Sequence, residues 1–188
     1  MTIFRNPRPE LHWYKAELGK EPFVYMLEDW KKGQDSITVY SNAENVELSV
    51  NGKTVATQTS SKDTIYDSLH HAPFKFKNFR YADGEVKAKA IFKDGKTKEV
   101  VHKTPGKPHA LELMVDTVGR KFTADGADIL MVYATVVDKN GTAIKEYNGK
   151  VTFSVSKNAM VVGDNANINA NPMFTEYGIA PALIRAGT

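Results

Sequence analysis

The chain has 188 residues, a formal net charge of +3 and no cysteine, with 41% hydrophobic and 25% charged residues. This composition is that of a globular protein, and no apolar run approaches the roughly 20 residues that a membrane-spanning helix needs. The lack of cysteine excludes disulfides, thiolate nucleophiles and cysteine-bound zinc. The small excess of cations is not gathered on one face, so we expect neither nucleic acid nor a membrane among the partners.

The N-terminal residues 1–22 differ from the rest of the chain. In the segment PRPELHWYKAEL, Leu11, Tyr14 and Leu18 follow Pro9 at helical spacing, which predicts a short helix. Five aromatic residues fall close together in and after this segment: Trp13, Tyr14, Phe23, Tyr25 and Trp30. They need a packing partner, which is either the following domain or a body outside this chain. We therefore interpret residues 1–22 as an N-terminal extension.

Residues 23–105 predict a first β-sandwich. Short stretches of alternating apolar and polar residues indicate strands at 37–41, 46–50, 53–58, 74–79, 85–92 and 97–103. Six Asx-Gly pairs, at 51–52, 83–84, 94–95, 125–126, 140–141 and 148–149, indicate hairpin turns along the whole chain. Asn and Asp tolerate a positive φ and glycine adopts it freely, so such pairs suit tight turns between antiparallel strands. Closely spaced strands of this kind are typical of a sandwich.

The segment Thr104-Pro105-Gly106-Lys107-Pro108 predicts an interdomain linker, because two prolines and a glycine interrupt both sheet and helix. After it, residues 106–188 predict a second sandwich of immunoglobulin-like type, with strands at 110–116, 121–125, 129–138, 150–156, 160–163 and 179–186. Two inward-facing rows are expected there: Leu111, Leu113 and Val115, and Val151, Phe153 and Val155. The predicted class is all-β, with two tandem immunoglobulin-like β-sandwiches and a short N-terminal extension.

No group of residues has the spacing of a catalytic, cofactor or metal site, so we expect none of these. The pairs Glu28/Asp29 and Asp125/Asp128 are interpreted as turn carboxylates, and the five histidines form no HExxH motif. Residues 138–141 resemble the opening of a calcium loop but lack its later ligands, which favours a hairpin turn. The Asn-rich stretch 164–169 is a weaker cation candidate.

Aromatic rings can stack on the apolar face of a sugar ring, and three residues are candidates for this role: Trp30, Tyr66 and Tyr81. The alternative for each of them is packing in a core or an interface, and we favour this alternative.

Four stretches together resemble the region after the catalytic barrel in bacterial glycoside hydrolase family 2 enzymes of the β-galactosidase type. They are WKKGQDSITVYSNAENVELSVNGKTV, HAPFKFKNFRYADGEVKAKAIFKDGKTKEVVHKTPGKPHALEL, FTADGADILMVYATVVDKNGTAI and MVVGDNANINANPMFTEYGIAPALIRAGT. In that family the catalytic glutamates lie on an upstream (α/β)8 barrel, and a barrel needs about 250 residues. No catalytic residue therefore transfers to this chain.

The resemblance implies a non-catalytic accessory region of a β-galactosidase-like enzyme that hydrolyses O-glycosidic bonds. The implied partners are the parent's catalytic barrel, whose end or exit residues 1–22 would represent, and carbohydrate. The implied location of the parent is the periplasm or the cell exterior, and the family's chain is expected to continue beyond Thr188. Two alternatives stay open at this point: a carbohydrate-binding module, and structural or adhesive immunoglobulin-like domains of a cell surface.

Overall fold

The computed structural model describes residues 8–60, 66–156, 158–163 and 171–188. Within these residues the chain forms thirteen strands and one helix, which confirms the all-β class. They divide into two compact units, one ending at Thr104 and the other beginning at Pro105. The one helix has ten residues, so no helix in the described part is long enough to cross a membrane.

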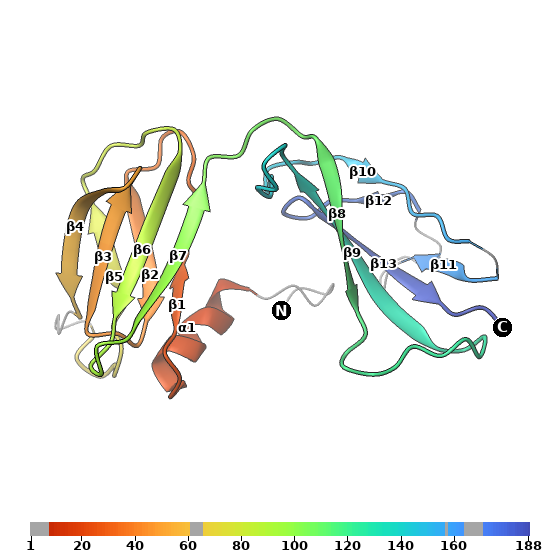
Figure 1. The fold of residues 1–188 in the computed structure, drawn as a ribbon, viewed down its shortest axis with the longest axis horizontal. Helices are drawn as coiled ribbons and strands as arrows, with labels where there is room; N and C mark the ends of the chain where they lie inside the picture. Colours follow the sequence, from red (N-terminus) through yellow and green to blue (C-terminus); the bar gives the residue numbers. More distant parts are fainter. Residues whose placement is uncertain (1–7, 61–65, 157, 164–170) are drawn as a thin grey trace. The chain divides into compact units, whose positions relative to one another are not determined.

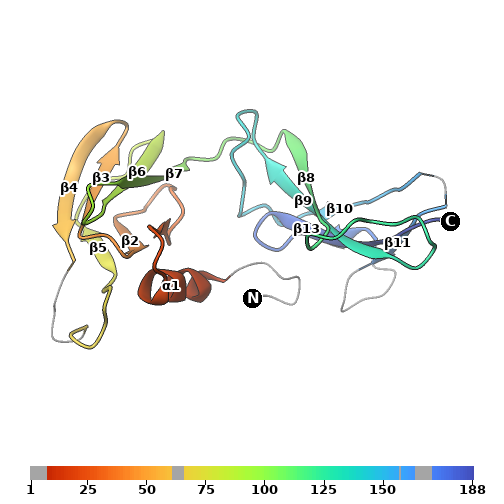
Figure 2. The ribbon, with the colours of Figure 1, turned by 60° about the horizontal axis from the view of Figure 1, so that its bottom comes forward.

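The first unit consists of one helix and two antiparallel sheets (Figure 1). Its elements are α1 (Pro9–Leu18), β1 (Val24–Met26), β2 (Ser36–Ser41), β3 (Asn45–Val50), β4 (Lys53–Thr59), β5 (Phe74–Lys77), β6 (Glu85–Ile91) and β7 (Thr97–Lys103). One sheet has the order β1-β2-β5 and the other the order β4-β3-β6-β7. The helix contacts β2, and Figure 2 shows it beside the smaller sheet.

The core of this unit lies between the two sheets. Successive side chains of a strand point to opposite faces, so every second residue is buried, as with Val46 and Leu48 on β3 and Ile37 and Val39 on β2. Exposed lysines alternate with buried phenylalanines on β5. Buried residues of both sheets form one hydrophobic cluster, as expected of a sandwich.

The Asx-Gly turns are only partly as predicted. The pair Asn51-Gly52 closes the β3–β4 hairpin with φ values of 48° and 79°, and Gly95 joins β6 to β7 with a φ of 78°. Gly141 also has a positive φ, in a tight turn after β9. The other three pairs lie in longer connections, because the chain there crosses between sheets or forms a wide loop.

The second unit consists of a four-stranded sheet and a two-stranded sheet. Its strands are β8 (Ala110–Asp116), β9 (Ile129–Val137), β10 (Lys150–Val151), β11 (Met160–Gly163), β12 (Met173–Phe174) and β13 (Ile179–Arg185). The large sheet has the order β11-β13-β9-β8, and β10 pairs with β12. No strand forms at 121–125, and the strand predicted at 150–156 ends at Val151. The immunoglobulin-like detail stays a prediction.

The inward row predicted on β8 is wrong. Leu111, Leu113 and Val115 are 50%, 64% and 54% exposed. The reason is that β8 is the outer strand of its sheet, whereas the small core of this unit forms over β9 and β13, where Ala134 and Ala180 are buried. The second predicted row faces the core at Val151, which is buried, and at Phe153, which packs against the core cluster, whereas Val155 is exposed.

Candidate functional site

Trp30 is a core residue, in agreement with the core packing that was favoured over sugar stacking. Its side chain is only 1% exposed, and its indole N–H donates a hydrogen bond of 3.0 Å to the carbonyl oxygen of Ala82. The ring packs against those of Phe79 and Tyr81, with centroid separations of 6.0 and 4.9 Å. Neither face of the indole is therefore available to a ligand.

Tyr81 is half-buried and is tied to the end of the first unit. Its hydroxyl donates to the carboxylate of Asp83 at 2.6 Å and lies 2.8 Å from the hydroxyl oxygen of Thr104. Burial, and then the hydrogen bond to Asp83, raise the pKa of Tyr81 above its usual value. One side of its ring packs on Trp30. Sugar stacking by Tyr81 stays a prediction, with at most part of the ring accessible.

Tyr66 does not join the other two candidates. It contacts Lys75 instead, whose ammonium hydrogen-bonds the tyrosine hydroxyl and lies 5.0 Å from the ring centroid, a cation–π arrangement. The ring is half-buried in the part of the chain that the structure describes. Sugar binding by Tyr66 also stays a prediction.

The paired carboxylates serve backbone geometry. Asp125 accepts hydrogen bonds from the backbone N–H groups of Ala127 and Asp128 at 2.9 and 2.7 Å, and these bonds lower its pKa. Asp128 accepts one from the N–H of Thr123 at 3.0 Å. The turn interpretation of this pair is confirmed.

Glu28 of the other predicted pair is bound to β2. Its carboxylate accepts hydrogen bonds from the backbone N–H and the hydroxyl of Thr38, at 2.5 and 2.8 Å. A carboxylate held by two donors of one residue fixes the loop before β2. It is not positioned for proton transfer to a ligand.

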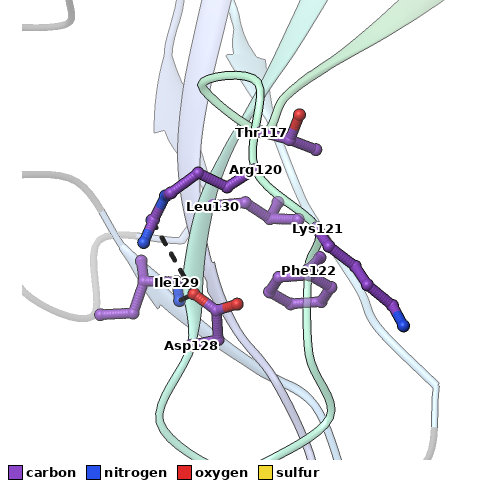
Figure 3. A pocket seen from close by; sticks show the side chains of 7 residues that line it. All are labelled: Thr117, Arg120, Lys121, Phe122, Asp128, Ile129 and Leu130. Atoms are coloured by element: carbon purple, nitrogen blue, oxygen red, sulfur yellow. Dashed lines mark hydrogen bonds and ion pairs between the residues drawn. The ribbon is translucent and has the colours of Figure 1, made fainter.

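A small hollow lies at the start of β9 (Figure 3). It is lined by Thr117, Arg120, Lys121, Phe122, Asp128, Ile129 and Leu130. The guanidinium of Arg120 reaches the carboxylate of Asp128 at 3.9 Å across one side. Its volume of about 10 Å³ holds roughly one water molecule, so a sugar ring does not fit.

The turn at 138–141 is not a calcium loop. The buried carboxylate of Asp138 accepts hydrogen bonds from the backbone N–H groups of Asn140, Thr142 and Gly106, at 2.8, 2.9 and 2.9 Å. These donors, Gly106 first, lower the pKa of Asp138 and occupy the oxygens that a cation would need. The described residues contain no group of three or more His, Asp or Glu able to hold a metal. The stretch 164–169 lies outside the described residues.

No sequence pattern predicts how α1 is attached to the first unit. The buried carboxylate of Glu17 accepts hydrogen bonds from the backbone N–H groups of His70 and His71, at 2.7 and 2.8 Å. The ring of His12 stacks on Tyr25 at a centroid distance of 3.8 Å. Burial, and then Lys15, lower the pKa of His12, which favours the neutral form of its ring. The helix is therefore fixed to the first unit on this side.

The opposite side of α1 is apolar and uncovered. Leu11, Tyr14 and Leu18 are all exposed, Leu18 by 71%. The ring of Trp13 packs edge-on against Tyr14. We call Leu11, Tyr14 and Leu18 the outer face of α1. The spacing of these three residues in the sequence predicted the helix. The helix is attached to the first unit through other residues, which are His12, Ala16 and Glu17.

Together these features define an all-β chain of two units, in which the carboxylates of Glu28, Asp125 and Asp128 accept backbone hydrogen bonds and the hollow beside β9 is too small for a sugar. Comparison with known families assigns the second unit. Residues 112–188 match glycoside hydrolase family 2 C-terminal domain 5, and residues 32–99 match a domain of unknown function, DUF4982. Over residues 112–188 the chain belongs to the C-terminal domains of family 2 glycoside hydrolases, which confirms the resemblance seen in the sequence.

Relatives of known name match nearly the whole chain. A β-galactosidase of Thermoanaerobacter pseudethanolicus is 32% identical over 98% of this chain and 26% of its own length. A β-glucuronidase of Formosa agariphila is 29% identical over 81% of this chain and 15% of its own length. The solved structure of a family 2 β-glucuronidase superposes with a TM-score of 0.79 and 28% identity, over 97% of this chain and 19% of that one. The chain thus spans about a quarter or less of these proteins.

Proposed function

We infer that this chain is a non-catalytic accessory region of a family 2 glycoside hydrolase, which buttresses a catalytic barrel and shapes access to its substrate. The observation that carries this proposal is the match of nearly the whole chain to about a quarter of a β-galactosidase. The accessory role is further supported by the described carboxylates of the two candidate pairs, since Glu28, Asp125 and Asp128 are committed to backbone groups.

The barrel is proposed to contact the outer face of α1. A large exposed side chain such as Leu18 is stabilised when its apolar surface leaves water, by about 25 cal/mol per Å² buried. Glu17 and His12 hold the helix in place before the barrel binds. Docking of the outer face of α1 therefore loses little conformational entropy of the helix.

The parent enzyme is proposed to hydrolyse O-glycosidic bonds in carbohydrate. The relatives are named β-galactosidase and β-glucuronidase, although both match this same region. Sugar specificity is therefore assigned to the barrel, and this region contributes mechanical support and the rim of the site.

A chimera tests the docking. The matching quarter of the T. pseudethanolicus β-galactosidase is replaced by this chain, and the double variant Tyr14→Ser, Leu18→Ser is compared with Lys15→Ser on the same helix. We expect the double variant to lower the thermal inactivation temperature of the chimera and to leave the unfolding temperature of the separate 188-residue chain nearly unchanged, because both side chains are exposed there. Lys15→Ser changes neither. The proposal would be contradicted if the chimera, its double variant and its Lys15→Ser variant all had the same thermal inactivation temperature.

A further inference from the structure

The ring of His12 joins α1 to the smaller sheet of the first unit through a series of stacked rings. It lies nearly parallel to the ring of Tyr25 on β1, with a centroid distance of 3.8 Å and an interplanar angle of 8°. It also stacks on Phe23 at 6.2 Å, and Tyr40 on β2 stacks on Tyr25 at 6.4 Å. We call His12, Phe23, Tyr25 and Tyr40 the aromatic stack.

The N-terminal half of α1 depends on this stack. The helix begins at Pro9, and Arg8 at the cap position provides no side-chain hydrogen bond to the helix. An uncapped end leaves backbone N–H groups without a helical partner and is less stable than a capped one. Glu17 holds the other end of the helix through two backbone N–H groups. Of the three residues that attach the helix, His12 lies nearest to its start.

The Nδ1 atom of His12 is buried and has no hydrogen-bond partner among the residues that the structure describes. A neutral imidazole can keep its one proton on Nε2 and leave a lone pair on Nδ1, whereas an imidazolium carries an N–H at both nitrogens. Protonation therefore places a charged donor at a buried position with no described acceptor, which is destabilising. Water outside the stack supplies that acceptor once the ring has moved.

We propose that His12 is an acid-sensitive attachment point of α1, whose neutral ring holds the N-terminal half of the helix on the smaller sheet and whose protonation releases it. The C-terminal half stays attached through Glu17, so the release is a local opening that leaves the core strands folded. It removes the support under Leu11 and Tyr14 of the outer face of α1. Only this consequence for docking rests on the proposed function.

The charges around His12 oppose its protonation. The nearest charged group on its own helix is the ammonium of Lys15, and burial, followed by this ammonium, lowers the pKa of His12. The ring face of Tyr25 attracts a cation, which acts in the opposite direction. Burial and Lys15 outweigh this attraction, because the pKa of His12 is lowered.

The two tyrosines of the aromatic stack stay neutral in acid. Burial is the main cause that raises the pKa of Tyr25 and of Tyr40 above the ordinary value of 10.0. The charged groups that act on them are Asp29 for Tyr25, and Glu28, Glu10 and Lys75 for Tyr40. Within the aromatic stack, His12 is therefore the ring that changes its charge between about pH 5 and 7.

The pH range of the release follows from the ordinary pKa of 6.5, which His12 regains when its ring is detached. Because the attached ring has the lower pKa, the detached state binds the proton more tightly. The attachment is therefore fully present well above pH 6.5 and weakens as the pH falls below this value. From about pH 7.5 to about pH 5, the opening equilibrium rises by at most about thirtyfold, the limit for an attached ring that binds no proton.

Amide hydrogen exchange of the purified 188-residue chain, at about pH 7.5 and about pH 5, tests the release. The rates are corrected for the intrinsic effect of pH, and β3 is the internal reference. We expect the opening of α1 to rise by about three- to thirtyfold at the lower pH, with β3 unchanged. His12→Phe keeps an aromatic ring that cannot titrate, so the opening of α1 becomes equal at both pH values within about twofold. The control His109→Phe, at an exposed position of the second unit, keeps the full rise.

An NMR titration of the imidazole of His12 in the original chain gives a second measurement, which needs no variant. We expect a pKa below 6.5 for His12. A pKa at or above 6.5, a rise in opening below about threefold, or a rise that persists in His12→Phe overturns the proposal. Because no barrel is present in these experiments, their outcome is independent of whether the outer face of α1 docks on one.

Discussion

Replacing Trp30 by alanine removes the largest fully buried side chain of the first unit. Truncation of a buried aromatic side chain to alanine costs about 3–5 kcal/mol, from lost apolar contact and the cavity left behind. The variant also leaves the carbonyl of Ala82 without its indole donor, and a typical hydrogen bond contributes about 1 kcal/mol. We therefore expect Trp30→Ala to lower the free energy of unfolding of the first unit by about 4 kcal/mol. Trp30→Phe keeps most of the ring and is expected to cost about half as much.

Urea unfolding followed by circular dichroism measures this loss, since strand signal does not depend on the tryptophan itself. The matched control is Tyr14→Ala, an aromatic residue that is 55% exposed, for which we expect a change within about 0.5 kcal/mol. A sugar-stacking role for Trp30 predicts the reverse, with normal stability and lost carbohydrate binding. A loss below about 1 kcal/mol for Trp30→Ala would refute the placement of this ring in the core.

Three further predictions concern the attachments and the remaining aromatic candidate. The pKa of Asp138 is lowered in the folded chain, so its carboxylate stabilises the fold above the unfolded value of 3.8. That stabilisation is lost as the pH falls through the folded pKa, and thermal unfolding of Asp138→Asn is expected to vary less with pH in this acidic range than that of the original chain. Glu17→Ala removes two charged hydrogen bonds and is expected to speed amide hydrogen exchange in α1 without changing the core strands, whereas the exposed Glu10→Ala leaves α1 protected. Tyr66→Ala is expected to leave retention on immobilised polysaccharide unchanged, and a clear loss of retention would favour a carbohydrate-binding module.

The β3–β4 hairpin of the first unit could be predicted because its determinants are local. In β3 the alternation of Val46, Leu48 and Val50 with polar residues places one face in the core, and Asn51-Gly52 supplies the positive φ values that the next turn requires. These two signals occupy adjacent positions in the chain. The pairing of β3 with β4 follows from them with no knowledge of distant residues.

The errors concern features that depend on distant partners. Leu111, Leu113 and Val115 alternate as a core-facing row would, but alternation does not say whether a second layer covers the strand. The contact from Glu17 to His70 spans 53 residues, and no local pattern encodes it. In each case tertiary packing decided the outcome.

The most direct test of the accessory role is the hydrolytic activity of the purified 188-residue chain. It is incubated with a chromogenic β-galactoside and a chromogenic β-glucuronide, beside the intact T. pseudethanolicus β-galactosidase as the active reference. The account predicts no release of chromophore above that in buffer with either substrate. The accessory role would be contradicted by hydrolysis of either substrate that copurifies with the chain and is lost when one carboxylate of the chain is replaced.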